Sequence, residues 1–527
     1  MSFGLWCVCC LLFAAGAGSA RADEAAWEAW RGLPVVAIDI DAGEVFDPTQ
    51  PDEDLWLFRW VNALHIRTRE GVIRRELLSR VGAPFDPQRV AESERNLRAL
   101  GIFQDVTIAA TLVDGGVRLR VRTADRWALR LLTDIGKEGD IYRVRLGLEN
   151  INFLGRGSVF GGNVVASNDV DAWQLFAGER RLFGSRWDGA YSYASDDLAV
   201  ANEARLVRPY YTELVQATAD LHYRSIRGDR RFFYDGAVAD TLDLDETIAE
   251  AFGAAYTHGD IRTRYGLLYS RRNVTRELDA HQAALGLCWG MLQRRFRRVR
   301  NVDRYGTSED ITSGWSVQVG AGADLQALGA SADRPMWRLD ATAATWIGDA
   351  GLVGFQLRHH GFARAGSVEN ARLQGEIYGF QQFSAQHCLT WDAGFAALER
   401  EPVYLRYAMG GDSHLRGYPA RFETGTRMLY GHLEHRWFTP LRVAFVGFGA
   451  AAFVDAGQAW EADEPLHLGA TQVAAGAGLR FGNRKSGSSI FRLDFAFGRD
   501  SFEVSIASGS FFRVARDFEF PEPNLYR

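Results

Sequence analysis

Residues 127–512 alternate apolar and polar side chains with a period of two, in runs of about ten residues, and this alternation predicts β-strands. The clearest pair of runs places two sets of side chains on opposite faces. One face holds Phe491, Leu493, Phe495, Phe497, Phe502, Val504 and Ile506, and the other holds Arg492, Asp494, Glu503 and Ser505. A soluble sandwich would place the phenylalanines inside. A transmembrane barrel with a wet interior places them outside, because lipid contacts its outer face. The pattern therefore predicts a membrane-spanning antiparallel β-barrel.

Two internal runs repeat this pattern. In the first, Ala283, Leu285, Leu287, Trp289 and Met291 lie on one face, and Gln282, Ala284, Gly286 and Cys288 lie on the other. In the second, Leu429, Leu433 and Trp437 lie on one face, and His432, Glu434 and Arg436 lie on the other. Lipid offers the backbone no hydrogen-bond partners, so strands span a membrane only as a closed barrel, and single-chain bacterial barrels have an even number of strands. Counting runs from Ile141 onward gives about nineteen candidates.

Composition and charge agree with a barrel. Aromatic residues make up 12% of the chain, it holds 55 glycines, and its mean hydropathy is −0.17. Beyond the first 20 residues, no apolar run approaches the ~18 residues that a membrane helix needs. The formal net charge of −6 argues against a nucleic-acid partner.

Residues 1–22 have the pattern of a signal peptide, with an apolar core from Leu5 to Ala15 and a small-residue site at Ala20–Ala22. A buried N-terminal helix is the alternative. Cleavage there would remove three cysteines, Cys7, Cys9 and Cys10, and leave a short segment, 23–33, before the first predicted strand. The two remaining cysteines, Cys288 and Cys388, lie in strand-like runs. We predict that both are interior positions and that they form no disulfide.

The pattern of apolar and capping residues over residues 34–126 predicts a small α/β module. A strand covers Val35–Ile40, and an aromatic-rich helix lies within Leu55–Ile66. Two capped helices follow, with Thr68 and Asp86 as expected N-caps; the first has Val72, Ile73, Leu77 and Val81 on one face. A hairpin that turns at Asp114–Gly116 completes a β-α-α-β-β unit.

This order resembles a POTRA domain, the periplasmic module of the BamA and two-partner-secretion superfamily of outer-membrane proteins. The residues that carry the resemblance are Asn62–Ile66 with Thr68, Gly82, Glu92–Arg98, Phe103–Val106 and Thr123–Trp127. The resemblance implies a module that holds extended client chains by strand addition. A plain spacer with solvated helix faces is the alternative, and the sequence does not separate the two.

A glycine-rich stretch, Gly410–Pro419, joins two strand-like runs and carries a single arginine, Arg416. We predict that it folds back into the barrel and that Arg416 pairs with Glu434 and Asp455. Strand parity puts Glu434 on the polar face with His432 and Arg436, and it puts Asp455 in phase with Gly447 and Gly449, which would leave room for a loop. An arginine fork suits two carboxylates because charge-assisted bidentate bonds are directional. The alternative is a surface loop with an exposed arginine.

The same stretch carries the more specific resemblance to the superfamily. Leu415-Arg416-Gly417-Tyr418 resembles its sixth-loop motif, and Phe453-Val454-Asp455-Ala456-Gly457 resembles its F-x-D-x-G strand. Leu433–Pro440 and Asn150–Gly157 resemble neighbouring family segments. The resemblance implies an outer-membrane barrel of sixteen strands. We therefore favour sixteen strands, with eighteen or twenty open, for residues 127–512, followed by a C-terminal tail, 513–527.

No residue pattern argues for an enzyme. His432 and His435 lie three residues apart, but in a strand they point to opposite faces and cannot converge on a metal ion. Gly320-Ala-Gly322 and Gly476-Ala-Gly478 lie inside strands without a following helix, so neither is a nucleotide loop. We expect no catalytic residues, no cofactor and no metal.

The preferred function is insertion of client polypeptides into the bacterial outer membrane, or their translocation across it, with the module in the periplasm. The resemblance implies that clients enter at a weak seam between the first strand, Ile141–Ile151, and the last, Ser501–Phe512. Expected partners are outer-membrane lipid, unfolded or extended client polypeptides, and periplasmic chaperones or accessory proteins. The alternatives are a two-partner-secretion exporter of a dedicated protein and a passive porin-like or structural barrel.

The sequence also predicts the side of the membrane on which some connections between strands lie. Polar inserts at Arg227–Asp243 and Arg294–Ile311 are expected to be extracellular loops, and Phe438–Pro440 a periplasmic turn. Two features depart from the superfamily pattern: family barrels usually end on an aromatic residue, whereas this chain continues past Phe512, and the main assembly machine carries several modules rather than one.

Overall fold

The computed structural model describes residues 27–47, 56–138, 141–168, 170–234, 237–257, 259–306, 308–401, 405–411, 413–443, 446–483, 491–508 and 510–513. The chain divides into two compact units. Unit 1 comprises residues 1–127 with 154–157, and unit 2 comprises residues 128–153 and 158–527. The expected signal peptide and residues 514–527 of the expected tail lie outside the described residues.

Unit 1 is a three-stranded sheet with helices. Its elements are β1 (Val35–Gly43), α2 (Trp56–Leu64), α3 (Glu70–Glu76), α4 (Pro87–Ala99), β2 (Phe103–Val113) and β3 (Gly116–Asp125). The sheet order is β1-β3-β2, with β1 parallel to β3 and β2 antiparallel to it. Asp86 caps α4 as predicted, because its side chain accepts a hydrogen bond from the Gln88 amide at 3.0 Å. No helix in the described ranges is long and apolar enough to cross a membrane.

The first capped helix differs from the expectation. Helix α3 ends at Glu76, so Leu77 and Val81 lie beyond it, and its N-cap position is Arg69 without a side-chain cap. The Thr68 hydroxyl instead donates to Asp125 at 2.8 Å. A fully buried carboxylate needs donors, and Thr68 supplies two, its hydroxyl and its amide.

Asp125 ties the end of β3 to the segment before α3. It accepts hydrogen bonds from the Thr68 amide at 2.7 Å and the Thr68 hydroxyl, and it lies 2.9 Å from His65 Nε2. Nearby, the Asn62 side chain donates to the Phe46 carbonyl and accepts from its amide. These contacts show why the polar residues of this unit occur where they do.

Replacing Asp125 with alanine is expected to destabilise unit 1 by about 2–4 kcal/mol, because two buried Thr68 donors lose their acceptor. Limited proteolysis of the full chain during heating would show cleavage in unit 1 at a lower temperature. The matched control is Asp39→Ala, which removes a half-exposed partner of Arg118 and should change stability by at most about 0.5 kcal/mol. Equal effects of the two changes would contradict the anchoring role.

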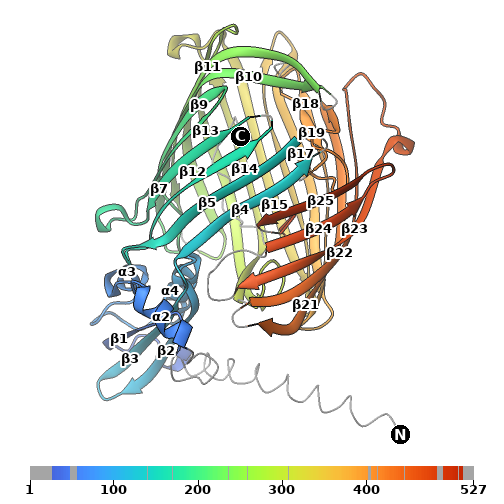
Figure 1. Ribbon diagram of the computed structural model, residues 1–527. Coiled ribbons are helices and arrows are strands. Elements are labelled where there is room, and N and C mark those ends of the chain that lie inside the picture. The colour runs from blue at the N-terminus through green and yellow to red at the C-terminus, as the bar shows by residue number, and fades with distance from the viewer. Residues whose placement is uncertain are drawn as a thin grey trace. The chain divides into compact units, whose positions relative to one another are not determined.

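In its described residues, unit 2 is a closed barrel of twenty strands, all antiparallel to their neighbours, and Figure 1 shows the barrel. The strands are β4 (Leu129–Glu138), β5 (Ile141–Phe153), β6 (Ser158–Ser167), β7 (Ala172–Glu179), β8 (Asp188–Asp196), β9 (Ala199–Arg208), β10 (Ala217–Tyr234), β11 (Ala237–Tyr256), β12 (Arg262–Arg276), β13 (Ala280–Arg300), β14 (Ser308–Asp324), β15 (Arg334–Ile347), β16 (Gly351–Arg364), β17 (Ser367–Gln382), β18 (His387–Glu399), β21 (Arg427–Val443), β22 (Val446–Trp460), β23 (Gln472–Asn483), β24 (Phe491–Phe497) and β25 (Phe502–Ser508). Short 3₁₀ helices lie at Leu182–Gly184, Gln326–Leu328 and Leu468–Ala470. The predicted barrel is confirmed, and its strand number is the highest of those left open.

Side chains alternate across the barrel wall. Leu433 and Trp437 on β21 are exposed on the outer face, whereas Glu434 and Arg436 between them are buried in the interior. The outer face is apolar around much of the barrel, as Leu148, Leu175, Leu267, Leu287, Phe355, Val454 and Phe495 show. The interior holds most of the buried charges of unit 2, among them Asp220, Arg272, Arg338, Asp392, Arg480 and Asp494. An apolar outside and a charged inside are the reverse of a soluble protein and fit a barrel set in lipid.

The barrel closes between β25 and β4, which lie side by side in Figure 1. The first strand is therefore Leu129–Glu138, and the expected first strand, Ile141–Ile151, belongs to the second strand, β5. The last strand ends at Ser508 instead of Phe512. Within the described residues, β25 and β4 share two register pairs, against seven between β24 and β25 and ten between β4 and β5. The closing seam is thus the sparsest of these three pairings.

One of the two expected extracellular loops, Arg294–Ile311, lies at the end of the barrel opposite to the one expected. Strands of this barrel join at alternate ends, so the β13–β14 connection within Arg294–Ile311 lies at the same end as the β21–β22 turn. A contact supports this, because the Tyr305 hydroxyl donates to the carbonyls of Thr439 and Phe448. The Arg227–Asp243 insert lies at the end that carries the β18–β21 loop, but it belongs mainly to β10 and β11.

The room left by the glycines of β22 serves a different segment from the one expected. A Cβ atom on Gly447 would overlap the Tyr305 ring, and one on Gly482 of β23 would do the same. The segment that fills this space is therefore 301–306, which enters from the β13–β14 end. The Arg416 loop occupies the interior farther along the strands.

Candidate functional site

The loop between β18 and β21 holds the residues of the candidate site. A small hairpin, β19 (Tyr407–Met409) paired with β20 (Glu423–Gly425), forms its base. Beyond this hairpin the chain enters the barrel, where Leu415 is fully buried and Tyr418 nearly so. They belong to an apolar cluster with Met409, Ala396, Met428, Ala459 and Ala474. Apolar packing therefore holds the loop inside the barrel.

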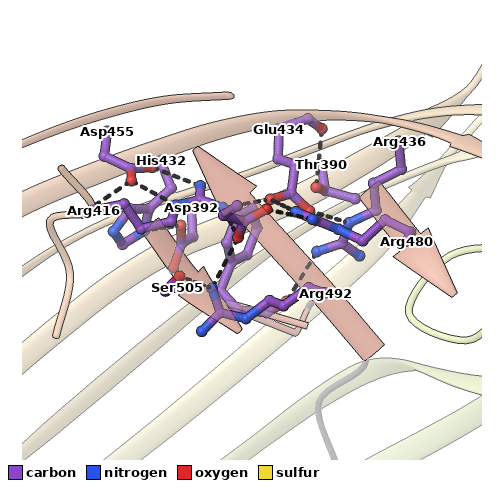
Figure 2. Close-up of polar contacts among 12 residues, drawn as sticks. Thr390, Asp392, Arg416, His432, Glu434, Arg436, Asp455, Arg480, Arg492 and Ser505 are labelled. Carbon is purple, nitrogen blue, oxygen red and sulfur yellow. Dashed lines mark hydrogen bonds and ion pairs between the residues drawn. The ribbon is translucent and has the colours of Figure 1, made fainter. Parts of the chain in front are cut away.

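Arg416 contacts both carboxylates that the sequence analysis selected. Its Nε and Nη2 donate to the two Asp455 oxygens at 2.7 and 2.8 Å, and its Nη1 donates to Glu434 at 2.8 Å. Its own amide also donates to Asp455, at 3.2 Å. Arg416 is 2% exposed, Glu434 1% and Asp455 0%, so this contact is shielded from solvent. Figure 2 shows the three side chains converging.

A wider network surrounds this contact. Glu434 also accepts from Arg436 Nε at 2.7 Å and from Arg480 at 3.3 Å. Asp494 lies 3.6 Å from Arg416 and accepts from Arg480 and Arg492. Four arginines, Arg416, Arg436, Arg480 and Arg492, thus meet four carboxylates, Asp303, Glu434, Asp455 and Asp494. The formal charges cancel, which limits the cost of burying them.

Aromatic rings lie against the Arg416 guanidinium. Its central carbon is 3.5 Å from the Phe453 ring centroid and 4.1 Å from that of Phe511. A cation close to a ring face is attracted by the ring quadrupole, more strongly where water is excluded. Phe453 therefore has a physical role in the F-x-D-x-G segment beside Asp455. Gly457 of the same segment lies against Met409 at the base of the loop, and a Cβ atom there would overlap the Met409 side chain.

The charge state of the loop residues follows from their contacts. Burial disfavours a charged Arg416, but Asp455 and Glu434 outweigh it and raise its pKa above the usual value. Burial and the neighbouring His432 lower the pKa of His414 to about 4, so His414 is neutral at pH 7. The loop therefore brings a single positive charge into the network.

The two histidines of β21 have separate partners. His432 Nδ1 lies 2.6 Å from Asp392, and its Nε2 lies 2.8 Å from the His414 carbonyl. His435 faces the other way and lies 3.3 Å from His387. The described residues hold no group of three or more His, Cys, Asp or Glu side chains arranged to bind a metal ion.

The site joins the last strands of the barrel to one another. Glu434 is on β21, Asp455 on β22, and Asp494 on β24. The loop also contacts the β24–β25 turn, because the Arg499 amide donates to the Tyr418 hydroxyl at 3.1 Å and the Ser501 hydroxyl donates to the Gly417 carbonyl. Gly417 has a φ of 84°, and a Cβ atom there would lie 3.0 Å from the Gly498 amide nitrogen. The loop thus holds the hairpin that borders the closing seam.

Several residues of the network were not selected from the sequence. Asp494 and Arg480 were available to it, because they lie on the polar face of strands near the chain end. Asp303 had no such signal, since it lies in a turn and reaches Arg436, at 2.9 Å, only by folding into the barrel. Phe511 was assigned to a strand instead of to the interior.

A comparison with protein families identifies the first unit. Residues 61–123 match the family model described as POTRA: Surface antigen variable number repeat. Unit 1 therefore carries a segment that matches the POTRA family model, and unit 2 is a β-barrel. The match agrees with the POTRA domain that the sequence predicted. Because β4 follows the POTRA domain directly in the chain, the barrel end at which β4 begins is termed the periplasmic end.

Solved structures similar to this POTRA-plus-barrel chain include BamA from Haemophilus ducreyi lacking POTRA domains 1–3. It shares 13% identity, with 91% of this chain and 85% of that chain covered and a TM-score of 0.39. CdiB from Acinetobacter baumannii shares 12% identity over 91% and 74% of the two chains, with a TM-score of 0.44. CdiB from Escherichia coli shares 11% over 91% and 77%, with a TM-score of 0.46. No curated protein matches the sequence.

Proposed function

We propose that this protein inserts client polypeptides into the outer membrane at the seam between β25 and β4. The observation that carries the proposal is the position of the seam. It shares two register pairs within the described residues, and it borders the β24–β25 hairpin that the Arg416 loop holds. A sparsely paired seam beside a fixed hairpin offers a strand edge to an incoming chain, because unpaired backbone groups accept another strand.

The POTRA domain fits a role in delivering extended chains. Its sheet order leaves β1 and β2 as edge strands. An extended peptide can add to such an edge through main-chain hydrogen bonds, which are largely independent of its sequence. We therefore propose unfolded or extended polypeptides as clients, and periplasmic chaperones or accessory proteins as further partners.

The barrel interior disfavours the two alternative functions. Segments 209–216 and 301–306 fold inward from the periplasmic end, as the buried Tyr210, Thr212, Val215, Val302 and Tyr305 indicate. Tyr210 packs 4.8 Å from Tyr256, and Glu213 pairs with Arg294 at 2.8 Å. These segments take up part of the interior, which suits lateral release at the seam better than the open passage that an exporter or a porin needs.

Depletion of the protein in growing cells tests the proposed function. We expect other β-barrel proteins to disappear from the outer membrane, with a protein carrying Arg334→Ala restoring them as the wild type does. Quantitative mass spectrometry of the membrane and of the medium measures both. Loss of one secreted protein alone would favour an exporter, and slower uptake of small solutes with an unchanged membrane would favour a porin. Either of these two results would overturn the proposal.

A further inference from the structure

The chain returns into the barrel after its last strand. Strand β25 ends at Ser508, and Phe511 and Phe512 lie against the Arg416 network in the interior. The Ser510 hydroxyl donates to the Asp303 carbonyl at 3.2 Å. This segment therefore occupies the space between the Arg416 network and the in-folded 301–306 segment.

The two phenylalanines of the segment make different contacts. Phe511 lies 4.1 Å from the Arg416 guanidinium and 5.4 Å from that of Arg492, and it meets the His432 ring edge-on at 5.2 Å. It lies against the same guanidinium as Phe453, which belongs to the wall of the barrel. The segment thus supplies one of the aromatic neighbours of the Arg416 side chain.

Phe512 joins the backbone to the network. Its carbonyl accepts a hydrogen bond from Arg436 Nη2 at 3.0 Å, and its ring stacks on His432 at 5.5 Å. The side chain is 8% exposed and belongs to an apolar cluster that includes Tyr305 and Cys388. A buried phenylalanine in such a cluster excludes water from the groups beside it.

We propose that residues 510–512 are a latch, which binds the interior surface formed by Arg416, His432 and Arg436 and closes this part of the barrel from the periplasmic end. The occupant is this chain's own C-terminal segment, recognised through its two aromatic rings and the Phe512 carbonyl. Release of the latch would uncover the Arg416 network and the apolar cluster without breaking any strand pairing, because the latch lies beyond β25.

The two native cysteines provide an internal test. Cys388 is fully buried in the cluster that contains Phe512, and Cys288 is buried in a separate cluster with Tyr210 and Leu292. Phe511→Ala with Phe512→Ala should raise the rate of Cys388 alkylation by a maleimide at least about tenfold, because removing the two rings that pack in and against the cluster opens it to solvent. Cys288 should react as slowly as in the wild type. Mass spectrometry of the labelled peptides of the full chain in lipid vesicles measures both rates.

The outcomes separate a latch from general unfolding. Unchanged labelling of both cysteines in the double variant would overturn the proposal. Faster labelling of both would also contradict it, because it would show that the phenylalanines hold the whole barrel together. A retained barrel, seen as an unchanged mobility shift on heating in detergent gels, is required alongside a selective change at Cys388.

A second measurement asks whether the segment acts as a bound peptide. Deletion of residues 509–527 should also speed Cys388 labelling, and a synthetic peptide of residues 507–516 added to the truncated protein should slow it again. The same peptide with alanine at 511 and 512 is the matched control and should have no effect. Protection by neither peptide, or by both equally, would contradict recognition through the aromatic pair. All of these readouts are independent of client insertion.

Discussion

Replacing Arg416 with alanine is expected to lower client insertion about tenfold or more while the barrel still forms. The change leaves Asp455 and Glu434 buried without their fork, and breaking such a pair from one side costs about 3–5 kcal/mol. The strand pairings are untouched, so this free energy is lost from the loop and from the β24–β25 hairpin that it holds. The measurement is the amount of newly inserted barrel protein in vesicles that contain each variant.

The matched control for this change is Arg334→Ala. Arg334 is also an interior arginine, with its Nη2 2.6 Å from Asp324 and its guanidinium 4.6 Å from the Phe362 ring, and these partners lie outside the Arg416 network. It should remove a comparable ion pair and leave insertion near the wild-type level. Full activity of Arg416→Ala, or an equal loss in both variants, would contradict a specific role of the loop.

Arg416→Lys separates charge from geometry. Lysine keeps the positive charge but cannot form the fork that reaches two Asp455 oxygens and Glu434 together. We expect insertion between that of the wild type and that of the alanine variant. A protease cut within 410–419 would report how far the loop leaves the interior in each variant.

A disulfide across the closing seam is expected to abolish insertion reversibly. Ser505 of β25 and Gly136 of β4 are register partners, so Ser505→Cys with Gly136→Cys places two thiols across the seam. The background carries alanine at Cys288 and Cys388 to prevent other pairings. An oxidised seam cannot open to an incoming strand. The same sample should regain insertion after reduction, which shows that the variant barrel is correctly folded.

The control disulfide joins two strands inside the barrel wall. Ala194 of β8 and Ala201 of β9 are register partners in a fully paired hairpin, and cysteines there should leave insertion unchanged when oxidised. If the oxidised seam variant inserts clients as fast as its reduced form, release does not occur between β25 and β4. The proposed function would then need a different exit.

The alternation of side chains predicted the number of strands more accurately than the family resemblance did. Runs counted from Ile141 gave about nineteen strands, and adding the strand that precedes them, Leu129–Glu138, makes the twenty observed. The first strand was missed because it follows the POTRA domain without a linker. The preference for sixteen strands came from the family resemblance. This barrel has extra hairpins, so its strand number differs from the one that the resemblance implies.

The extent of the site depended on segments with no periodic signal. Asp303 and Phe511 lie outside the strands, and their contacts depend on how the chain folds inward beyond β13 and β25. Alternation predicts the face of a strand residue but not that of a turn residue. Residues Asn301–Gly306 were therefore predicted to lie at the extracellular end. Gly447 correctly marked an open space, but Tyr305 rather than the Arg416 loop fills it.

The sequence by itself determined the architecture and the chemistry of the loop. Period-two alternation places side chains on known faces, because a strand's geometry depends only on neighbouring residues. That was enough to predict a barrel and to select Glu434 and Asp455 as partners for Arg416. Only the tertiary structure decided where the barrel closes, which segments enter it, and that Phe511 lies against Arg416. Those features arise from contacts between residues distant in the chain, for which no local pattern exists.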